Sequence, residues 1–428
     1  MILAGCLALS VALFGQENIV TLVALMVQAV FLVFFARHLS FAICAISSAP
    51  FDLHAPVIDS GFRPSVAVIV ACKNEEAVAE RLADGLVALD YPDALLQLIL
   101  VDDGSTDRTF GILEARAAVD PKLIVVRRAP GAGGGKSGAL NCGLEYTSAE
   151  IIVVFDADHR PRPNVIRRLV RHFEDPAVAA VQGRCEISNP DDSALTQLVA
   201  IDYLAGYLVN EYGRQALYQL PAYGGANCAV RASELHAVGG WNPETVTEDT
   251  DLTMRLLLSG RRVRYDVTAV DEEEGVVTLA RYWRQRYRWA RGHQQVWRDY
   301  RRAVVRSTHL NVFEKIETSL FLLVFHLPAF SALGMGILFL WLGGIVHPVD
   351  PVNAFVLWTL LFLGPLLELG GGLLIARADR RTALYLVLFL PIFFVGIAVC
   401  TKAWFDGLRG KPYSWAKTRR AAEDLELA

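Results

Sequence analysis

Residues 150–162, EIIVVFDADHRPR, decide how the fold of this chain is read. The run from Ile151 to Phe155 holds only β-branched and aromatic residues, which predicts a strand buried on both faces of a parallel sheet. Asp156 and Asp158 follow at its carboxyl end. Ligands of open α/β sheets bind outside this end, and two carboxylates there can hold a divalent cation. The alternative for an isolated Asp-Ala-Asp is a polar turn that ends the strand.

Three further stretches predict buried strands in the same part of the chain, at residues 65–72, 96–101 and 123–128. Helical stretches lie between them, and polar or acidic residues follow the strands. This alternation predicts βαβ units and an α/β domain with a mainly parallel sheet. We place the domain at residues 62–300, and its binding site at the carboxyl ends of the strands.

The composition predicts membrane segments on both sides of this domain. Of the 428 residues, 53% are hydrophobic, and they concentrate before Arg37 and after Phe313. The formal net charge of -4 argues against nucleic-acid binding by bulk electrostatics. The seven cysteines show no Cys-x-x-Cys spacing, which favours free thiols over a disulfide framework or a zinc site.

An amino-terminal membrane region is expected at residues 1–38. Residues 19–36 carry no charge and are long enough to cross a bilayer, and residues 2–14 are a shorter apolar partner. No Lys or Arg precedes Arg37, so a secretory signal is rejected. The basic residues from Arg37 onward place the following domain in the cytoplasm by the positive-inside rule.

A carboxyl-terminal membrane region is expected at residues 312–405, with apolar runs at 316–346, 352–375 and 383–405. The first run is too long for one straight span, so it predicts an interfacial helix followed by a span, or a kinked hairpin. Glu368 inside an apolar run is costly unless it faces a polar cavity, which makes it a candidate for lining a sugar path. The alternative is a glutamate at a helix bend near water.

The loop Gly131–Gly138, GAGGGKSG, resembles a phosphate-binding P-loop. Pro130 stands where the first Gly of that motif belongs, so the spacing fails by one residue. Lys136 could still reach a diphosphate from this Gly-rich turn. A solvated loop lysine explains the stretch equally well.

Two short motifs follow later in the domain. The glycine pair of Pro221–Arg231, PAYGGANCAVR, would permit close approach of the backbone to a ligand, or would simply form a turn. Thr247-Glu248-Asp249 precedes a predicted helix at residues 250–258. These residues are typical of helix N-termini, but a carboxylate held there can also act as a general base.

Residues 281–306 contain nine arginines interleaved with Trp and Tyr, including Gln285-Arg286-Tyr287-Arg288-Trp289. This pattern predicts an interfacial helix whose arginines reach the lipid headgroups. Basic and aromatic residues also bind nucleic acid, but the neighbouring membrane segments argue against it.

The ordered set of motifs KNEE, DDGSTD, GKSGALN, DAD, GGAN, TED and QRYRW resembles the membrane-integrated enzymes of glycosyltransferase family 2. This group includes the processive synthases of cellulose, chitin, hyaluronan and poly-N-acetylglucosamine. The resemblance extends from about Ser65 to Trp289. It implies a GT-A type catalytic domain, flanked by transmembrane helices, that transfers a sugar from a nucleotide-sugar.

The resemblance also implies roles at the matching positions. Glu75 and Asp102 or Asp103 would contact the nucleobase and ribose, Lys136 the diphosphate, Asp156 the nucleotide, and Asp158 a Mg²⁺ or Mn²⁺ ion. The acidic pair Glu248 and Asp249 would be catalytic, with Asp249 as the base. Gln285, Arg288 and Trp289 would line the diphosphate and acceptor sites. Charge developing on the leaving diphosphate could be stabilised by the metal and Arg288.

One departure from the family pattern concerns residues 271–276. The family often has an acidic residue followed by Pro before Gln-x-x-Arg-Trp, whereas this chain reads DEEEGV. The shape of this loop is therefore not predicted.

The expected activity is inverting transfer of a sugar from a nucleotide-sugar, with a UDP-sugar as the expected donor, to a growing β-linked polysaccharide that is passed across the membrane. One alternative is a single transfer to a membrane lipid, because some lipid glycosyltransferases share Gln-x-x-Arg-Trp. A second is a non-catalytic transporter or interaction protein, which the intact motifs argue against. The expected location is the cell (inner) membrane, with several crossings.

The carboxyl-terminal tail, residues 406–428, is densely basic and is expected in the cytoplasm. Its Trp415, Thr418 and Arg420 resemble the Trp/Phe-x-x-Thr-x-Lys/Arg gating segment of the polysaccharide synthases. This resemblance implies a segment that closes over the bound nucleotide, with Arg420 at the diphosphate. The alternative is a basic patch attracted to anionic lipid.

Overall fold

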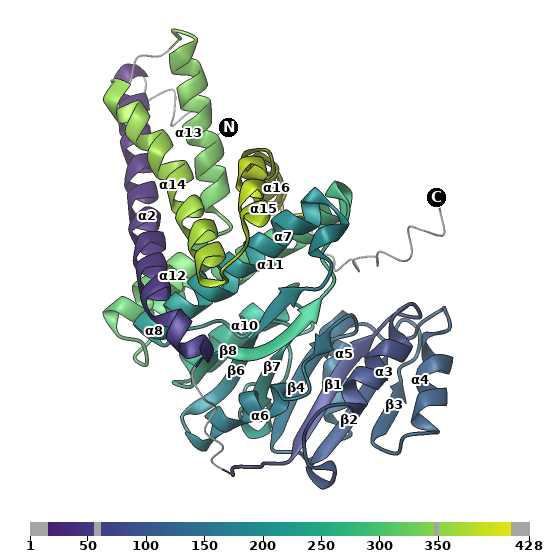
Figure 1. Cartoon of the computed structure of the whole chain (residues 1–428). Helices are drawn as coiled ribbons and strands as arrows, with labels where there is room; N and C mark the ends of the chain where they lie inside the picture. Colours follow the sequence, from purple (N-terminus) through teal and green to yellow (C-terminus); the bar gives the residue numbers. More distant parts are fainter. Residues whose placement is uncertain (1–15, 55–60, 346–350, 412–428) are drawn as a thin grey trace.

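The structure, a computed structural model, describes residues 16–54, 61–345 and 351–411. Figure 1 shows a mixed β-sheet surrounded by helices, from which a bundle of longer helices rises on one side. The sheet has eight strands in the order β3-β2-β1-β4-β7-β6-β8-β5.

The first four strands form the parallel half of the sheet: β1 (Val66–Cys72), β2 (Leu96–Asp102), β3 (Leu123–Arg127) and β4 (Ile151–Asp156). All pairings among them are parallel, and each strand agrees with its predicted range to within one residue. The register places Asp102 opposite Cys72, and Asp156 opposite Ala71. The carboxyl ends of β1, β2 and β4 therefore meet at one edge, as predicted.

The other half of the sheet is mixed, and sequence analysis did not predict its strands. It contains β5 (Arg160–Pro161), β6 (Val178–Ile187), β7 (Cys228–Arg231) and β8 (Arg262–Glu273). β7 pairs antiparallel with both β4 and β6, whereas β6 and β8 are parallel. Four of the seven strand pairings are thus parallel, in agreement with the predicted mainly parallel sheet, whereas the antiparallel pairings of β7 and β5 were not predicted.

Helices cover both faces of the sheet. They are α3 (Ala79–Val87), α4 (Thr109–Ala117), α5 (Gly135–Leu144), α6 (Val165–Val170), α7 (Ala194–Ala205), α8 (Tyr212–Tyr218), α9 (Ala232–Ala237) and α10 (Glu248–Leu258). Short 3₁₀ turns occur at η1 (Asp93–Leu95), η2 (Arg171–Glu174) and η3 (Pro190–Asp192), and a π-helix, η4 (Gly206–Glu211), joins α7 to α8.

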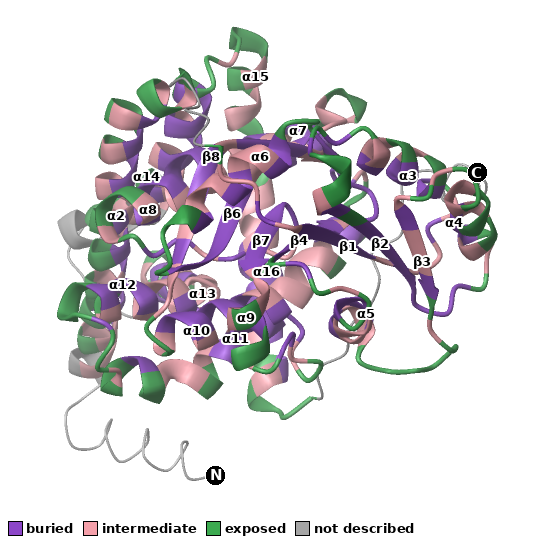
Figure 2. Ribbon diagram, turned by 90° about the horizontal axis from the view of Figure 1, so that it is seen from below, coloured by how far each residue is buried: buried purple, intermediate pink, exposed green. Residues whose placement is uncertain are grey.

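The core lies in two layers separated by the sheet. Along β1, Val66 and Val68 belong to one buried cluster together with α3, whereas Ala67 and Ile69 belong to another together with α5. This division follows from the alternation of side chains along a strand. Figure 2 shows β1, β4, β6 and β7 almost entirely buried. A strand with both faces covered can be continuously apolar, as the sequence of β4 is.

The remaining helices form the bundle and its base: α2 (Gln16–His54), α11 (Leu279–Arg306), α12 (Val312–Leu323), α13 (Leu327–Leu342), α14 (Pro351–Ile375), α15 (Arg380–Leu384), η5 (Tyr385–Leu388) and α16 (Phe389–Leu408). α11 packs on α12 and α16, and α14 packs on α2 and α7. Figure 1 shows α7 and α11 between the sheet and the upper bundle.

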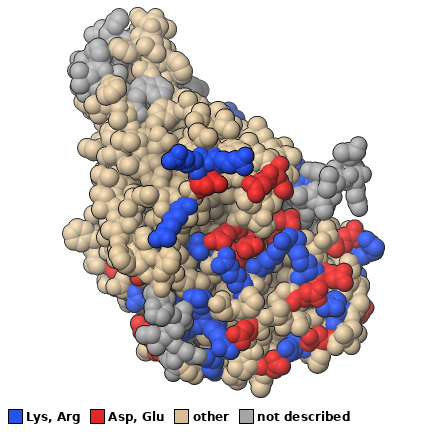
Figure 3. All heavy atoms as spheres, in the orientation of Figure 1, with Lys and Arg blue, Asp and Glu red and all other residues tan. Residues whose placement is uncertain are grey.

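Within the described residues, two helical stretches are long and apolar enough to cross a membrane, Ile19–His54 and Arg380–Leu408. Helices α12 and α13 would form a third span if the two are treated as one bent helix, with a bend of 68° between them. A kink or hairpin in this run was predicted, and the break falls just before Pro328. In Figure 3, charged side chains gather over the sheet and the bundle's base, and the upper bundle is mostly uncharged. These features indicate association with a membrane.

Candidate active site

A cavity of about 790 Å³ begins at the carboxyl ends of the parallel strands and continues between the bundle helices. It contains almost every described residue to which sequence analysis gave a role: Glu75, Asp103, Lys136, Asp156, Asp158, Glu248, Asp249, Gln285, Arg288 and Trp289. These residues span more than 200 positions of sequence. The fold therefore gathers the separate motifs around one space.

The aspartate pair after β2 divides between two environments. Asp103 lines the cavity, where its carboxylate accepts from Arg128 and from Lys73 Nζ at 3.2 Å. Asp102 is fully buried and does not line the cavity. Its carboxylate lies 3.4 Å from the backbone N of Ser105 and 3.7 Å from Arg127 Nε. Of the two alternatives for the nucleotide contact, the geometry favours Asp103.

Lys136 lies at the centre of the acidic groups. It stands in the first turn of α5, which begins after Gly134 in the left-handed conformation (φ 74°). Its Nζ lies 2.5 Å from Asp156 Oδ1 and 3.5 Å from Glu248 Oε1, and donates to Gly225 O at 2.8 Å. Burial alone would lower the pKa of Lys136, but the two carboxylates outweigh it and raise the pKa. Lys136 is thus a mostly buried cation, with a side chain 15% exposed, and not a solvated loop lysine.

The glycine pair before β7 permits close packing at this point. A Cβ on Gly225 would lie 3.2 Å from Lys136 Nζ and 3.3 Å from Asp249 Oδ2. A Cβ on Gly224 would lie 2.9 Å from Gln182 Oε1. Any side chain here would press on the charged groups or on Gln182, so packing explains why glycines occupy both positions.

Asp249 is held at the start of α10. Its Oδ1 accepts from the backbone N of Thr250 at 2.6 Å and from the Thr250 hydroxyl at 3.2 Å. Thr247, at the N-cap, makes no side-chain capping bond, so helix capping does not explain the whole motif. Burial and the neighbouring charge of Glu248 raise the pKa of Asp249 to about 6, although the Thr250 bond and Lys136 oppose the rise. A carboxylate with this pKa suits general-base chemistry near neutral pH.

The helix α11 supplies Gln285, Arg288 and Trp289 to the opposite wall of the cavity. Among the described residues, Gln285 Oε1 and Arg288 Nε are buried atoms without a hydrogen-bond partner. Within the described part of the chain, Arg286 Nε is also without a partner, but Arg286 Nη2 pairs with Asp202, and the guanidinium lies 4.7 Å from the centre of the Trp289 ring. Unpaired buried polar atoms are unusual in proteins, and a bound ligand would satisfy them.

The acidic segment at the end of β8 also lines the cavity, and sequence analysis assigned it no role. Glu273 and Glu274 line the same cavity as Asp158. Arg281 from α11 also lines it. The run Asp271-Glu272-Glu273-Glu274 was noted only for its missing Pro. An acidic cluster at the end of a strand was the available signal, but the strand β8 itself was not predicted.

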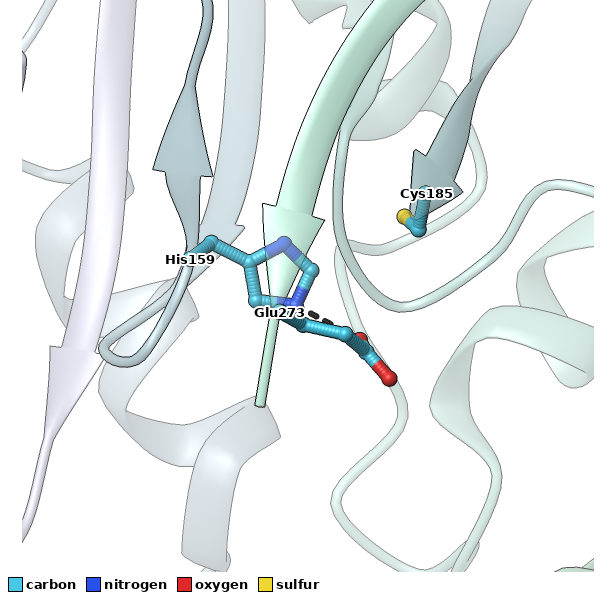
Figure 4. A group of neighbouring side chains, drawn as sticks. All are labelled: His159, Cys185 and Glu273. Atoms are coloured by element: carbon cyan, nitrogen blue, oxygen red, sulfur yellow. Dashed lines mark ion pairs between the residues drawn. The ribbon is translucent and has the colours of Figure 1, made fainter. Parts of the chain in front are cut away.

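His159, Cys185 and Glu273 form a group whose potential ligand atoms lie within 4.8 Å of one another (Figure 4). His159 Nδ1 lies 2.5 Å from Asp271 Oδ2, and Nε2 lies 2.9 Å from Glu273 Oε2. Burial would lower the pKa of His159, but these two carboxylates outweigh it and hold the pKa well above its usual value. A protonated imidazole has no lone pair for a metal. The group is therefore better described as a buried ion pair that positions Glu273.

Asp156 and Asp158 are the better candidates for a metal. Both line the cavity at the end of β4, and carboxylate oxygens are the preferred ligands of Mg²⁺ and Mn²⁺. The expected tail residues Trp415, Thr418 and Arg420 lie outside the described residues, as does the apolar run at residues 2–14.

A family model described as "Glycosyltransferase like family 2" matches residues 64–292, which is more than half of the chain. The chain belongs to glycosyltransferase-like family 2. The matched region holds every described residue that sequence analysis assigned to the nucleotide-sugar and acceptor sites, and the predicted enzyme class is confirmed.

Two relatives indicate the range of activities among similar proteins. A "Beta-monoglucosyldiacylglycerol synthase" of Synechocystis sp. is 39% identical over 281 residues, which cover 65% of this chain and 58% of the relative. The "Poly-beta-1,6-N-acetyl-D-glucosamine synthase" of Staphylococcus epidermidis is 26% identical over 257 residues, covering 59% and 61%. The chain thus matches somewhat more than half the length of each relative.

The solved mannosyltransferase PcManGT from Pyrobaculum calidifontis, in complex with GDP-Man and Mn²⁺, has a similar fold. The TM-score is 0.60 at 21% identity, and the match covers 90% of this chain and 99% of that one. The predicted GT-A type domain with flanking apolar helices is therefore confirmed as the fold.

Proposed function

We propose that this protein transfers a single sugar from a nucleotide-sugar to the hydroxyl group of a membrane lipid. The main support for this proposal is the cavity, which connects the acidic strand ends to a space between apolar helices. The 39% identity to a relative named for glucosyl transfer to diacylglycerol supports the same acceptor class. A lipid could place its hydroxyl beside Asp249 while its chains remain among the bundle helices.

The donor would occupy the end of the cavity at the strands. Glu75 and Asp103 would contact the nucleobase and ribose, and Lys136 and Arg288 the diphosphate. Asp156 and Asp158 are a suitable ligand set for Mg²⁺ or Mn²⁺, with Asp158 as the proposed direct ligand. When bound, such an ion would neutralise charge on the leaving diphosphate. Arg288 would add a cation at the same place, consistent with its unpaired Nε.

The transfer itself needs one proton to move. Asp249 would take the proton of the lipid hydroxyl as its oxygen attacks the anomeric carbon of the sugar. The bond from that carbon to the diphosphate breaks, and the nucleoside diphosphate leaves with the bonding electrons. Attack opposite the leaving group inverts the anomeric centre. Glu248 would act indirectly, because its charge raises the pKa of Asp249 and holds Lys136.

The membrane end of the cavity is walled by apolar side chains from several helices. Phe34 of α2, Leu360 of α14 and Phe393 of α16 are among them. Apolar walls of this kind suit the acyl chains of a lipid acceptor.

We further propose that the domain at residues 62–300 lies on the cytoplasmic side of the membrane. The regions at residues 1–38 and 312–405 would anchor it, and the tail at 406–428 would return to the same side. The basic residues that flank the apolar segments support this orientation. A cysteine introduced at position 418 should react only with reagent applied from the cytoplasm.

The test uses the purified full-length chain in neutral detergent, supplied with a panel of UDP- and GDP-sugars and with diacylglycerol. We expect one donor to give a lipid carrying one sugar, identified by mass spectrometry, with nucleoside diphosphate release that depends on the lipid. The Asp249→Asn variant is the control for contaminating activity. A product that grows to a long carbohydrate chain would instead support the polysaccharide alternative, which the 26% identity to a polymer synthase keeps as the second candidate.

A further inference from the structure

The membrane end of the cavity contains a group of polar side chains that the proposed catalytic chemistry does not use. His38 of α2, Asn210 of the π-helix η4 and Glu368 of α14 all line the cavity, together with Arg37. The segment that carries His38 and Arg37 is one of the two candidate membrane spans, and Glu368 lies in the shorter apolar helix Phe362–Ile375. Ionisable residues in such segments are costly, and they usually mark a functional site.

The members of this group are joined by hydrogen bonds around Glu368. His38 Nδ1 lies 2.5 Å from Glu368 Oε1, and Asn210 Nδ2 donates to both carboxylate oxygens at 2.9 Å. An ionised carboxylate cannot donate, so Nδ1 of His38 carries the proton of the shared bond. The second ring nitrogen of His38, Nε2, has no recorded partner within the described residues and is the ring atom left for a ligand.

Arg37 provides a second unused polar atom. Its Nε and Nη2 bind Glu317 of α12 at 2.9 and 2.8 Å. Its Nη1 is buried without a hydrogen-bond partner, and the side chain is only 3% exposed. A buried guanidinium nitrogen without a partner costs free energy unless a ligand oxygen meets it.

Both helix irregularities near this group support a binding role. Asn210 belongs to a π-helix, a rare form that is often found at functional sites. Pro365 interrupts the hydrogen bonding of α14 three residues before Glu368 and also lines the cavity. Two distorted helices therefore meet the cavity where the polar group lies.

The charges of the group restrict the chemistry of its ligand. Arg37 is balanced by Glu317, and His38 faces Glu368. Arg214 and Glu211, which adjoin Glu317, also form an ion pair. The net charge of the group is zero if His38 is protonated and negative if it is not. A phosphate would find no unbalanced cation here, whereas uncharged ester carbonyl and hydroxyl groups could bond to Nη1 and Nε2.

We propose that Arg37, His38, Asn210 and Glu368 form a subsite for the oxygen-bearing backbone of an uncharged diacyl lipid. The inference rests on the proposed function, since it assigns the acceptor class of the same cavity. The ester groups of the lipid bond to the subsite, its chains lie among the bundle helices, and its hydroxyl extends toward Asp249. The subsite excludes lipids whose backbone carries a phosphate.

The test measures lipid binding without sugar transfer. A diacylglycerol with a photoactivatable acyl chain is irradiated with the purified full-length chain in neutral detergent, and the label is quantified by mass spectrometry. We expect a tenfold excess of plain diacylglycerol to remove the label from the wild type. Phosphatidic acid with the same chains should not remove it.

Two variants change the subsite in different ways. Glu368→Gln is nearly isosteric but removes one negative charge, so labelling should fall at least fivefold and phosphatidic acid should begin to compete. A misfolded protein would not acquire competition by phosphatidic acid, so this result separates a change in the subsite from a folding defect. Asn210→Leu should fill the subsite and reduce the label independently. Thr359→Val is the matched control, because Thr359 lies exposed on α14 and does not line the cavity.

The inference is overturned if both subsite variants are labelled like the wild type, or if phosphatidic acid competes equally in the unaltered protein. Its failure is separable from failure of the proposed function. If the protein transfers sugar to the lipid but the variants do not change the labelling, the proposed subsite is wrong and the proposed function stands. If the lipid labels the protein specifically but no donor gives sugar transfer, the proposed subsite stands and the proposed function is wrong.

Discussion

The carboxylate of Asp249 has two different oxygens. Oδ1 is occupied by the backbone and hydroxyl of Thr250, whereas Oδ2 lies beside Gly225, where an added Cβ would be 3.3 Å away. The residue is therefore oriented by its own helix while one oxygen faces the backbone of a glycine. This arrangement fits a base better than a cap, and it yields a prediction.

Replacing Asp249 with Asn should lower the rate of transfer by about 10²–10⁴-fold, because the amide cannot accept the proton of the acceptor. Binding of the nucleoside diphosphate, measured by calorimetry, should change little, because the two side chains have nearly the same shape. A rate within a few-fold of the wild type would mean that Asp249 only supports the start of α10.

The pH dependence of the wild type follows from the raised pKa of Asp249. A base acts only when deprotonated, so kcat/KM should fall about tenfold per pH unit below pH 6 and level off above it. The measurement is a pH series from 5 to 8 at subsaturating acceptor, with nucleotide binding followed in parallel. A flat profile across this range would contradict the assignment.

Asp158 is the residue that should decide metal dependence. The Asp158→Asn variant should weaken Mn²⁺ binding and abolish metal-stimulated transfer, because a neutral amide is a poor ligand for a hard cation. Chelation of the wild type by EDTA should have the same effect and should be reversed by added Mn²⁺. Asp191→Asn is the control, because Asp191 is exposed and lies outside the cavity. Full turnover in EDTA would remove the metal from the proposal.

The contact between α11 and the start of α10 is the element on which the site depends. A Cβ on Gly292 would lie 2.3 Å from Thr247 Cγ2 and 2.6 Å from its hydroxyl, which is closer than real side chains approach. The glycine therefore lets the helix of Gln285 and Arg288 lie against the segment of Asp249. Sequence analysis noted both segments, but this contact between them was not predicted.

Gly292→Ala should push α11 away from α10 and reduce transfer by about tenfold or more, since small misplacements of reacting groups are costly. The melting temperature should also fall. Gly111→Ala in α4 is the matched control, because its Cβ would meet nothing within 4 Å. That variant should keep full activity and gain about 0.5–1 kcal/mol of stability. Equal activity of the two variants would show that the close contact is not required.

At the scale of the whole molecule, the end of α16 is attached to the helix that carries Arg288. Asp406 Oδ2 accepts from the Tyr287 hydroxyl at 2.8 Å, and Lys411 O accepts from Arg291 Nη2 at 2.5 Å. The last described residues are therefore held on the same helix as Arg288.

Truncation after Lys411 removes the tail but keeps these two contacts. If the tail closes over the nucleotide, transfer should fall about 100-fold even in neutral detergent, measured with saturating donor. If it is only a basic patch for anionic lipid, detergent activity should be unchanged and only binding to anionic vesicles should weaken. Because the truncated chain keeps the contacts of Asp406 and Lys411 with α11, a loss of activity could not be attributed to detachment of α16.

Much of the parallel half of the sheet could be predicted because its signals are local. The apolar runs of β1, β2 and β4 are visible in single stretches, and the polar residues after them mark the strand ends. By contrast, β7 is only four residues long, and the twelve residues of β8 alternate irregularly between polar and apolar. Such strands are stabilised by their neighbours, so their sequences alone do not identify them.

The sequence by itself determined the enzyme family, the strand ends that carry Asp103 and Asp156, and the apolar segments on both sides of the domain. Only the tertiary structure decided that Lys136 lies between two carboxylates, and that one cavity extends from these residues into the helix bundle. It also decided that His38 meets Glu368, 330 positions away. Such contacts depend on how the whole chain packs, because no local pattern records which distant residue will be adjacent.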